Sequence, residues 1–470
     1  MATLASHPLF PADTNDQIVL HDKVYNLCAL ALRAYILTWY SRFSPRDRAL
    51  LPAINRDILV PLLGPILADL HSDSAPLADL ILLHVPTLAA THLQVYWAAR
   101  AAVTLAGDDD LATAYHARAP LLITERVNDT YVLSPRYCSA LVESFLALRL
   151  SPSEYAADAE RLVVREVVAR AVLVSVGRRL AQPWFYAQIV LKLLGQPGTP
   201  RRGKSIGNQP PPYPPHKGWQ RGVHIALRTY RTLVTVITVL WSGLTWLIAT
   251  LSACPPASPK HNRVMDPWLA VAAAWLGTDG RAGLARPSWS VRTAWGSVEI
   301  VTALLAPILD RLLPYLLEQH LNAKLGIKVV DLLERILFPN GYPGPPPVDP
   351  TPEEAKALDS ALRQRVDELV PRRLKLWVTP VDGDSVDALV DPFSNAGCNA
   401  HLVGTLYNAV VATLLPELVQ GDAPATTSGK ATPPVEAAPP YSVSDEKASV
   451  NENKVDEKAS ALDKKVQEKA

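Results

Sequence analysis

One stretch of this chain constrains its fold more than any other, because residues 232–254 read TLVTVITVLWSGLTWLIATLSAC without Asp, Glu, Lys, Arg or His. About 20 consecutive apolar residues suffice for one helix to cross a bilayer. A helix that is apolar all round has to be covered all round, by protein, by a lipid ligand or by a bilayer. Three possibilities therefore stay open: a core or cavity helix, a helix that dips into a membrane, and a transmembrane span.

The charges around this stretch favour contact with a membrane. No acidic residue occurs between Glu166 and Asp266, whereas thirteen Lys and Arg residues do. Because both flanks are basic, the positive-inside rule does not indicate the orientation of a span. Each Lys or Arg near an anionic leaflet contributes about 1 kcal/mol to membrane binding. We expect an anionic membrane surface to be contacted by Arg201, Arg202, Lys204, Arg221, Arg228 and Arg231.

The apolar stretch also contains recurrent hydroxyl side chains, from Thr232 to Ser252. Such hydroxyls can donate to carbonyls of their own helix and so remain compatible with an apolar setting. The side chains predicted to contact lipid, in a cavity or in a bilayer, are Val236, Leu240, Trp241, Leu244, Trp246 and Leu247.

The rest of the sequence is typical of an all-α protein. Helix starts with a hydroxyl cap, a proline and a carboxylate three residues after the cap occur at Ser44, Ser151 and Thr351. Apolar residues at steps of three and four predict helices over 325–337 and 163–172. No series of short alternating strands with Asn-Gly or Asp-Gly turns is present. The fold class we expect is two helical units packed together around an elongated apolar core or cavity.

Proline-rich breaks and changes of composition divide the chain. The predicted tail is too poor in apolar residues to offset its ordering entropy, and it contains DEKAS twice. The predicted parts are an N-terminal extension at 1–15, a helical domain at 16–194, a basic linker at 195–221, the apolar helix with a second helical domain at 222–420, and a disordered tail at 421–470.

Motifs that resemble catalytic or nucleotide-binding signatures fail in their context. Residues 198–205 fit GxxxxGK[ST], but prolines follow within a few residues, where the phosphate-binding helix would have to begin. Residues 203–207 fit GxSxG, but no sheet is predicted beside them. We therefore expect no enzymatic activity.

The cysteines and histidines give no sign of a metal site or a cofactor. Cys28, Cys138, Cys254 and Cys398 lie far apart with no CxxC pair, which predicts free thiols in a reducing compartment. The sequence likewise provides no basic and apolar leader at its start. The histidines on apolar helices are isolated in the sequence and are expected to be ordinary core or surface residues: His84, His92, His320 and His401.

Three segments resemble the PX-associated (PXA) domain. They are residues 37–44 (LTWYSRFS), residues 86–96 (PTLAATHLQVY), and Val164-Arg165-Glu166 followed by residues 182–185 (QPWF). Within the first of these, Trp39, Tyr40 and Ser44 are expected to be structural, the two rings in the core and Ser44 as a helix cap.

Further along, residues 332–341 (LLERILFPNG), 401–403 and 414–418 resemble the nexin C-terminal domain of the same sorting-nexin proteins. The resemblance implies PXA and nexin C halves that pack around an elongated apolar cavity, with lipid binding or transfer at organelle contacts. This chain departs from the larger members, since it shows no PX domain, no RGS region and no N-terminal transmembrane pair.

These observations lead to one expected function and one alternative. We expect a protein that binds glycerophospholipids at a cytosolic membrane face, with lipid transfer as an extension of that binding. It is expected to be peripheral on the endoplasmic reticulum, endosome or vacuole, with an integral span at 232–254 as the other possibility. The alternative is a trafficking tether or scaffold that binds protein partners without carrying lipid. A PPxY match at Pro210–Tyr213 is a candidate site for a WW-type partner, and nucleic acid is not an expected partner.

Overall fold

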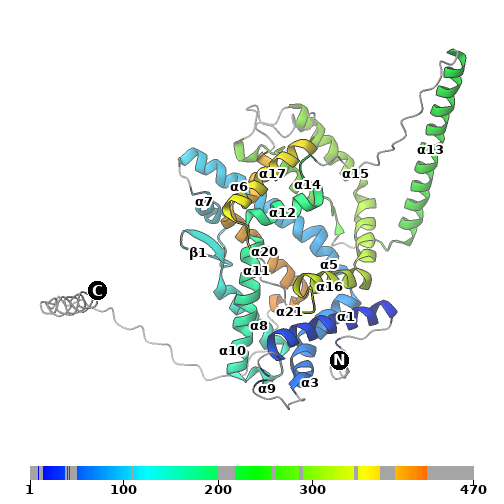
Figure 1. Cartoon of the computed structure of the whole chain (residues 1–470). Coiled ribbons are helices and arrows are strands. Elements are labelled where there is room, and N and C mark those ends of the chain that lie inside the picture. The colour runs from blue at the N-terminus through cyan, green and yellow to red at the C-terminus, as the bar shows by residue number, and fades with distance from the viewer. Residues whose placement is uncertain are drawn as a thin grey trace, which may run out of the picture. The chain divides into compact units, whose positions relative to one another are not determined.

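The computed structural model describes residues 9, 14–37, 40, 42, 50–107, 110–198, 218–256, 261–284, 289–342, 348–370 and 387–420. Residues 1–423 form one compact unit. The predicted tail at 421–470 lies outside the described residues. The described chain is mostly helical, as predicted (Figure 1).

The first part of the chain runs from α1 to α12. Its α-helices are α1 (Asn15–Leu32), α3 (Leu50–Ile54), α4 (Val60–Ser72), α5 (Ala75–Asp79), α6 (Val85–Ala106), α7 (Leu111–Arg118), α8 (Pro135–Arg149), α9 (Pro152–Tyr155), α10 (Asp158–Glu166), α11 (Ser175–Leu180) and α12 (Pro183–Leu194). Short π-helical segments lie between or after some of these helices: η1 (Arg33–Leu37), η2 (Asn55–Leu59), η3 (Leu80–His84) and η4 (Val167–Val174).

The second part of the chain runs from α13 to α21. Its α-helices are α13 (Gly218–Ala253), α14 (Asp266–Leu276), α15 (Trp289–His320), α16 (Ala323–Leu337), α17 (Pro352–Leu369), α19 (Asp387–Val390), α20 (Ala396–Leu414) and α21 (Pro416–Gln420). Two single 3₁₀ turns are η6 (Arg281–Gly283) and η7 (Asp391–Phe393). Helix α13 begins at Gly218, inside the interval that the sequence assigned to a linker.

Two of the three predicted helix starts are confirmed, and the third, Ser44, lies outside the described residues. The hydroxyl of Thr351 accepts from the amide of Glu354, whose carboxylate accepts from the amide of Thr351 in return. The hydroxyl of Ser151 accepts from the amide of Glu154 at the start of α9, but α9 ends at Tyr155 and α10 begins at Asp158. The helix expected to continue from Ser151 is therefore interrupted.

One β-hairpin belongs to the described part of the chain, and the sequence analysis did not predict it. Strands β1 (Thr124–Val127) and β2 (Thr130–Leu133) pair antiparallel. Asn128 and Asp129 connect them with φ angles of 48° and 61°, the left-handed conformation that two-residue hairpin turns require. The turns expected from the sequence were Asn-Gly and Asp-Gly, whereas this turn is Asn-Asp, and both of its residues can adopt the left-handed conformation.

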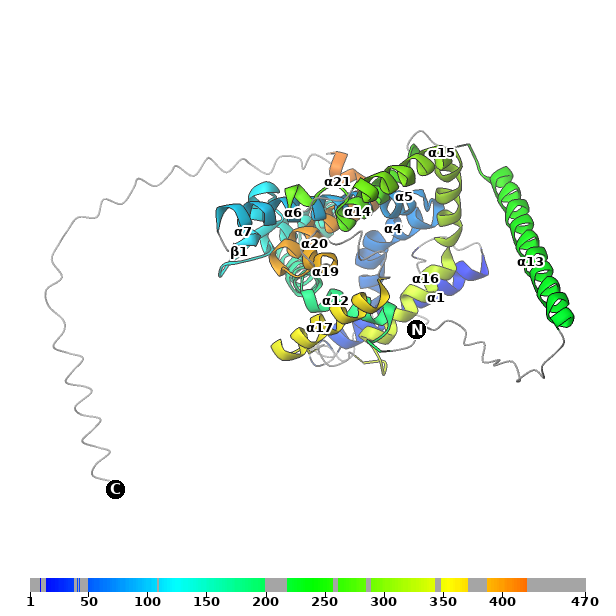
Figure 2. The same ribbon diagram turned by 90° about the horizontal axis from the view of Figure 1, so that it is seen from above.

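The two parts of the chain share their core. Helix α14 packs along α6, α17 along α12 and α16 along α1, and Figure 2 shows the last two pairs from above. One buried cluster joins Tyr96 and Tyr115 to Cys398, and another joins Leu191 to Leu362. Helix α20 crosses the hairpin at Gly404, where an added Cβ would stand 2.0 Å from Ile123 Cγ2. Buried faces of the first part are thus covered by helices of the second.

Candidate functional site

An apolar groove lies between α1, α4, α5 and the beginning of α16. Its volume is about 720 Å³, within the range of roughly 300–1,000 Å³ that small-molecule sites occupy. Its lining is mostly aliphatic, with hydroxyl, amide and charged groups near the start of α16. The aliphatic residues are Leu20, Val24, Leu67, Leu70, Leu77, Leu321, Leu325, Val329 and Val330.

One wall of the groove is made by a parallel pair of helices from opposite parts of the chain. Three polar contacts join α1 to α16, and a fourth joins Arg33, at the start of η1, to Tyr342, five residues beyond α16. The two residues of each contact are 308 or 309 positions apart in the sequence. The contacts are Asp16–Lys324 at 3.7 Å, Lys23–Asp331 at 2.7 Å, Asn26–Glu334 at 3.1 Å and Arg33–Tyr342 at 2.7 Å. A constant separation along both helices means that they run in the same direction.

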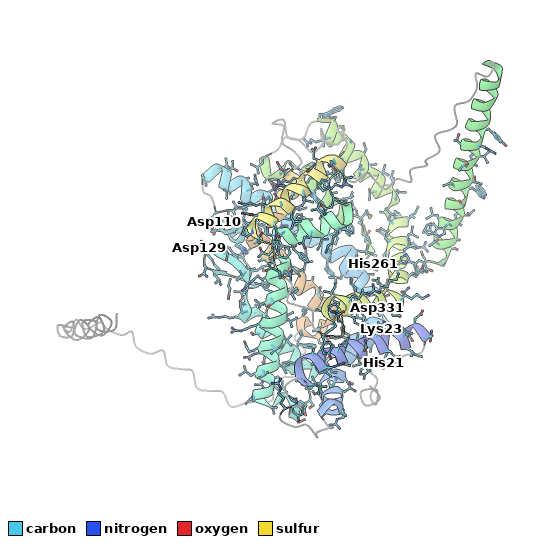
Figure 3. All side chains as sticks on the ribbon, viewed as in Figure 1. His21, Lys23, Asp110, Asp129, His261 and Asp331 are labelled. Atoms are coloured by element: carbon cyan, nitrogen blue, oxygen red, sulfur yellow. The ribbon has the colours of Figure 1, made fainter. Side chains whose placement is uncertain are left out.

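Close approach and charge both hold this pair together. At Gly326 an added Cβ would lie 3.1 Å from a methyl group of Leu20, so glycine allows the two helices to come near. Figure 3 shows Lys23 and Asp331 pointing toward one another from α1 and α16. The hydrogen bond to Asp331 raises the pKa of Lys23 above its ordinary value, so the ammonium stays charged.

The apolar stripe that predicted α16 does not lie in the core. The helix is confirmed, but Leu332 is 57% exposed and Ile336 is 63% exposed, and none of its residues is buried. Leu325 and Val329 of the same stripe contribute to the groove instead. An exposed apolar stripe beside an apolar groove is unusual for a soluble surface and is characteristic of binding sites.

The apolar stretch identified first lies in α13 and is not buried. Trp241 and Trp246 are 67% and 55% exposed, and Leu247 is partly exposed. Its hydroxyls bond within the helix as expected, for example from Thr235 Oγ1 to the carbonyl of Arg231 at 2.8 Å. The side chains of Val236, Leu240 and Leu244 lie outside the described residues. Of the predicted lipid-contact residues whose side chains are described, Trp241, Trp246 and Leu247, none lines the groove described above.

Of the predicted basic contacts, Arg231 has an exposed side chain at the start of the apolar stretch. Arg221 and Arg228 belong to α13, but their side chains lie outside the described residues, as do Arg201, Arg202 and Lys204 entirely. The same holds for the PPxY match at 210–213, for the GxSxG match at 203–207, and for Trp39 and Ser44. Tyr40 is described and half-buried.

Three helical segments of the described chain are long and apolar enough to cross a membrane, by length and composition only. They are Ala75–Ala106, Tyr230–Ala253 and Trp289–His320. Their most apolar windows differ in how much of them the protein buries: 39%, 0% and 17%, respectively. The first segment therefore serves the core, whereas α13 has no protein cover in its window.

Histidines that are isolated in the sequence converge in the fold, and His92 and His401 are core residues, one of the two placements expected for them. Tyr115 donates to His92 Nδ1 at 3.0 Å, and His401 Nδ1 lies 3.5 Å from the same hydroxyl. His92 Nε2 donates to the carbonyl of Pro392 at 3.1 Å, and His116 Nε2 to that of Gly397 at 3.1 Å. No signal in the sequence links these residues, because α6, α7 and α20 meet only through tertiary packing.

Burial keeps this histidine cluster neutral. Desolvation lowers the pKa of His92 and of His401 to about 4, and it lowers the pKa of His116 as well. Within the described residues, no group of His, Cys, Asp and Glu side chains is arranged to hold a metal ion. The cluster therefore joins helices and is not arranged as a metal centre.

Comparison with known proteins gives one match. Residues 18–193 match the family model of the PXA domain, which spans α1 to α12, whereas a nexin C domain is not detected. No curated protein and no solved structure matched the chain. The chain thus contains a PXA domain, a module associated with sorting-nexin-like proteins of membrane trafficking.

Proposed function

We propose that this protein binds a glycerophospholipid at a cytosolic membrane face or organelle contact site, and that it acts by binding and not by catalysis. The observation that carries the proposal is the aliphatic groove of about 720 Å³ between α1, α4, α5 and α16. Each methylene removed from water contributes about 0.8 kcal/mol, so an acyl chain gains affinity in proportion to the length that the groove covers.

The polar residues of the groove suit a lipid headgroup. Asn322 and Lys324 stand at the start of α16, and Thr14, Gln17 and Ser72 add neutral hydrogen-bonding groups. Lys324 lies 3.7 Å from Asp16 and is mostly exposed, so its ammonium can turn toward a phosphate at little cost. An acyl chain among the aliphatic residues would leave its headgroup beside these groups.

The second part of the chain is proposed to act as a nexin C-like counterpart of the PXA domain. Helix α16 carries the LLERIL segment of the resemblance, and α20 carries the segment that begins at His401. Both helices pack on elements of the PXA domain. A lipid site shared by the two parts would explain why the groove needs α16, and transfer between membranes would follow if the lipid can leave by the same opening.

The test compares two tryptophan variants of one helix. Val329→Trp places an indole in the groove, whereas Leu332→Trp changes an exposed residue of α16 that does not line it. Purified full-length protein is analysed for bound lipid by mass spectrometry. We expect lipid in the wild type and in Leu332→Trp, and at least a tenfold loss in Val329→Trp. A wild-type protein that carries no lipid, or equal lipid in all three, contradicts the proposal.

A scaffold function is the second candidate, and a different surface favours it. Five aliphatic residues are 46–62% exposed along α10, η4 and α11: Leu162, Val163, Val167, Val172 and Val176. Such a stripe fits an apolar helix of a protein partner. A lipid-free protein that loses a binding partner on Val163→Asp would establish this second function in place of the first.

A further inference from the structure

The segment between Gly198 and α13 begins at a fixed point on the folded unit. The amide of Gly198 donates to both carboxylate oxygens of Glu368 at 3.1 Å. Beside it, Arg365 donates to the carbonyl of Leu194 from two nitrogens, at 3.0 and 2.8 Å, and so caps the end of α12. The chain therefore leaves the PXA domain from a position held against α17.

The C-terminal end of α13 is also held against the folded unit. Arg311 of α15 donates to the carbonyls of Cys254 at 2.9 Å, Pro255 at 3.2 Å and Leu251 at 3.3 Å, which are the acceptors that a helix end leaves free. The side chain of Cys254 is buried. Shortly afterwards His261 contacts Asp79 of α5 at 2.5 Å, a contact whose histidine is labelled in Figure 3.

These two attachments restrict how α13 can meet a bilayer. If α13 crossed it, residues 199–217 would have to pass back through the hydrocarbon, because Gly198 and Cys254 are both fixed to the same unit. That segment contains six prolines and four Lys or Arg residues. Non-helical backbone exposed to lipid does not occur in the hydrocarbon region, since its polar groups would lack partners.

A return on the same side is geometrically possible. Helix α13 has 36 residues, which at 1.5 Å per residue gives a length of about 54 Å. The twenty residue steps from Gly198 to Gly218 reach at most about 66 Å when fully extended. The sequence between Gly198 and Gly218 is therefore long enough to reach the start of α13 from the side of the folded unit.

The described side chains of α13 differ between its faces. Apolar residues about one or two turns apart form what we call the aromatic–aliphatic stripe: Tyr230, Val234, Ile237, Trp241 and Ile248. All five side chains are at least 42% exposed. The side next to the stripe carries the hydroxyls of Thr235, Thr238, Ser242 and Thr245, and Val239 and Trp246 follow beyond them. The hydroxyls donate to carbonyls of their own helix, so the side that carries them is compatible with the apolar part of a leaflet.

We propose that α13 is a monotopic membrane helix, inserted by its aromatic–aliphatic stripe into one leaflet of an anionic bilayer, with both ends on the side of the folded unit. The proposal rests on the proposed function in that the protein works at a membrane. Charge selects the partner, because thirteen basic and no acidic residues lie between Glu166 and Asp266.

Vesicle flotation tests the stripe. Full-length protein is mixed with phosphatidylcholine vesicles that contain or lack phosphatidylserine. We expect the wild type to bind the anionic vesicles. Trp241→Asp should reduce this binding by about tenfold or more, because an aspartate buried in the bilayer costs more than 1.4 kcal/mol. Ser242→Asp should change the binding by less than about twofold. Equal losses in both variants overturn the proposal. The proposal is also overturned if the wild type does not float but forms an oligomer that Trp241→Asp dissociates. That result would mean that the stripe binds a second copy of the chain.

Labelling tests the topology. A membrane-impermeant maleimide is added to vesicle-bound Ser205→Cys, whose position precedes α13 in the sequence, and to Ser153→Cys at the exposed start of α9. We expect equal labelling of both above the wild-type background, which Cys28 dominates because the other three thiols are buried. Selective protection of Ser205→Cys identifies a transmembrane span and overturns the proposal.

The two proposals fail separately. A protein that carries lipid but does not float contradicts the monotopic helix and leaves the groove intact. A protein that floats while Val329→Trp leaves its bound lipid unchanged contradicts the groove and leaves the helix.

Discussion

At the scale of single residues, the histidine cluster gives the molecule its clearest chemical property. His92, His116 and His401 are buried among Tyr115 and two backbone carbonyls, and desolvation lowers the pKa of each, which disfavours the protonated form. The Nε2 atom of His401 also has no hydrogen-bond partner. A buried unpartnered nitrogen is costly, and its protonation would place a charge in the core.

This cluster predicts that acid destabilises the protein. The pKa of His92 and of His401 is about 4 in the fold and 6.5 in the unfolded chain. Between these values the unfolded chain binds more protons, so the free energy of unfolding falls as pH falls, by roughly 1.4 kcal/mol per pH unit for each histidine. Urea denaturation at several pH values between 7 and 4 measures this slope.

The matched variant is His401→Phe, which keeps a ring and removes the unpartnered nitrogen. We expect nearly unchanged stability at pH 7 and a slope that is smaller by about one proton. A slope identical to that of the wild type would mean that His401 does not titrate on unfolding.

At the scale of elements, sequence patterns predicted helices more reliably than they predicted what those helices face. The stripe Leu325 to Leu337 placed α16 correctly, yet most of it is exposed. The valines from 163 to 172 are divided between surface and core, since Val164 and Val168 pack against a buried cluster whereas Val163, Val167 and Val172 are exposed. Hydrophobic periodicity identifies the apolar face of a helix, but the element that packs against this face comes from a distant part of the sequence.

The parallel pair of α1 and α16 leads to an element-scale prediction. Lys23→Glu sets a carboxylate against Asp331 and should loosen α16, whereas Lys23→Glu with Asp331→Lys restores an opposite-charge pair. Hydrogen exchange of α16 amides is the measurement. We expect faster exchange in the single variant and recovery in the double variant, and exchange that stays fast in the double variant would show that the pair does not hold the helix.

At the scale of the whole molecule, the PXA domain depends on the helices that follow it. Helices α14, α16 and α17 cover α6, α1 and α12, and α20 supplies His401 and Cys398 to buried clusters. Residues 18–193 match a family model by sequence, but their apolar faces are completed by residues beyond Leu194.

This dependence predicts how truncated chains behave. A fragment of residues 1–194 exposes the faces that α14 and α17 cover and should lack a cooperative unfolding transition in calorimetry. A chain of residues 1–423 keeps the compact unit intact and should unfold as the full-length protein does. A sharp transition in the shorter fragment would show that the PXA domain folds without its second part.

The sequence by itself determined the helical class, the caps at Ser151 and Thr351, the free cysteines and the PXA segments, because these depend on neighbouring residues or on local motifs. Only the tertiary structure decided that α13 is uncovered, that α16 borders a groove with α1, and that three distant histidines meet. These features depend on contacts between residues up to 309 positions apart, and local periodicity carries no information about such contacts.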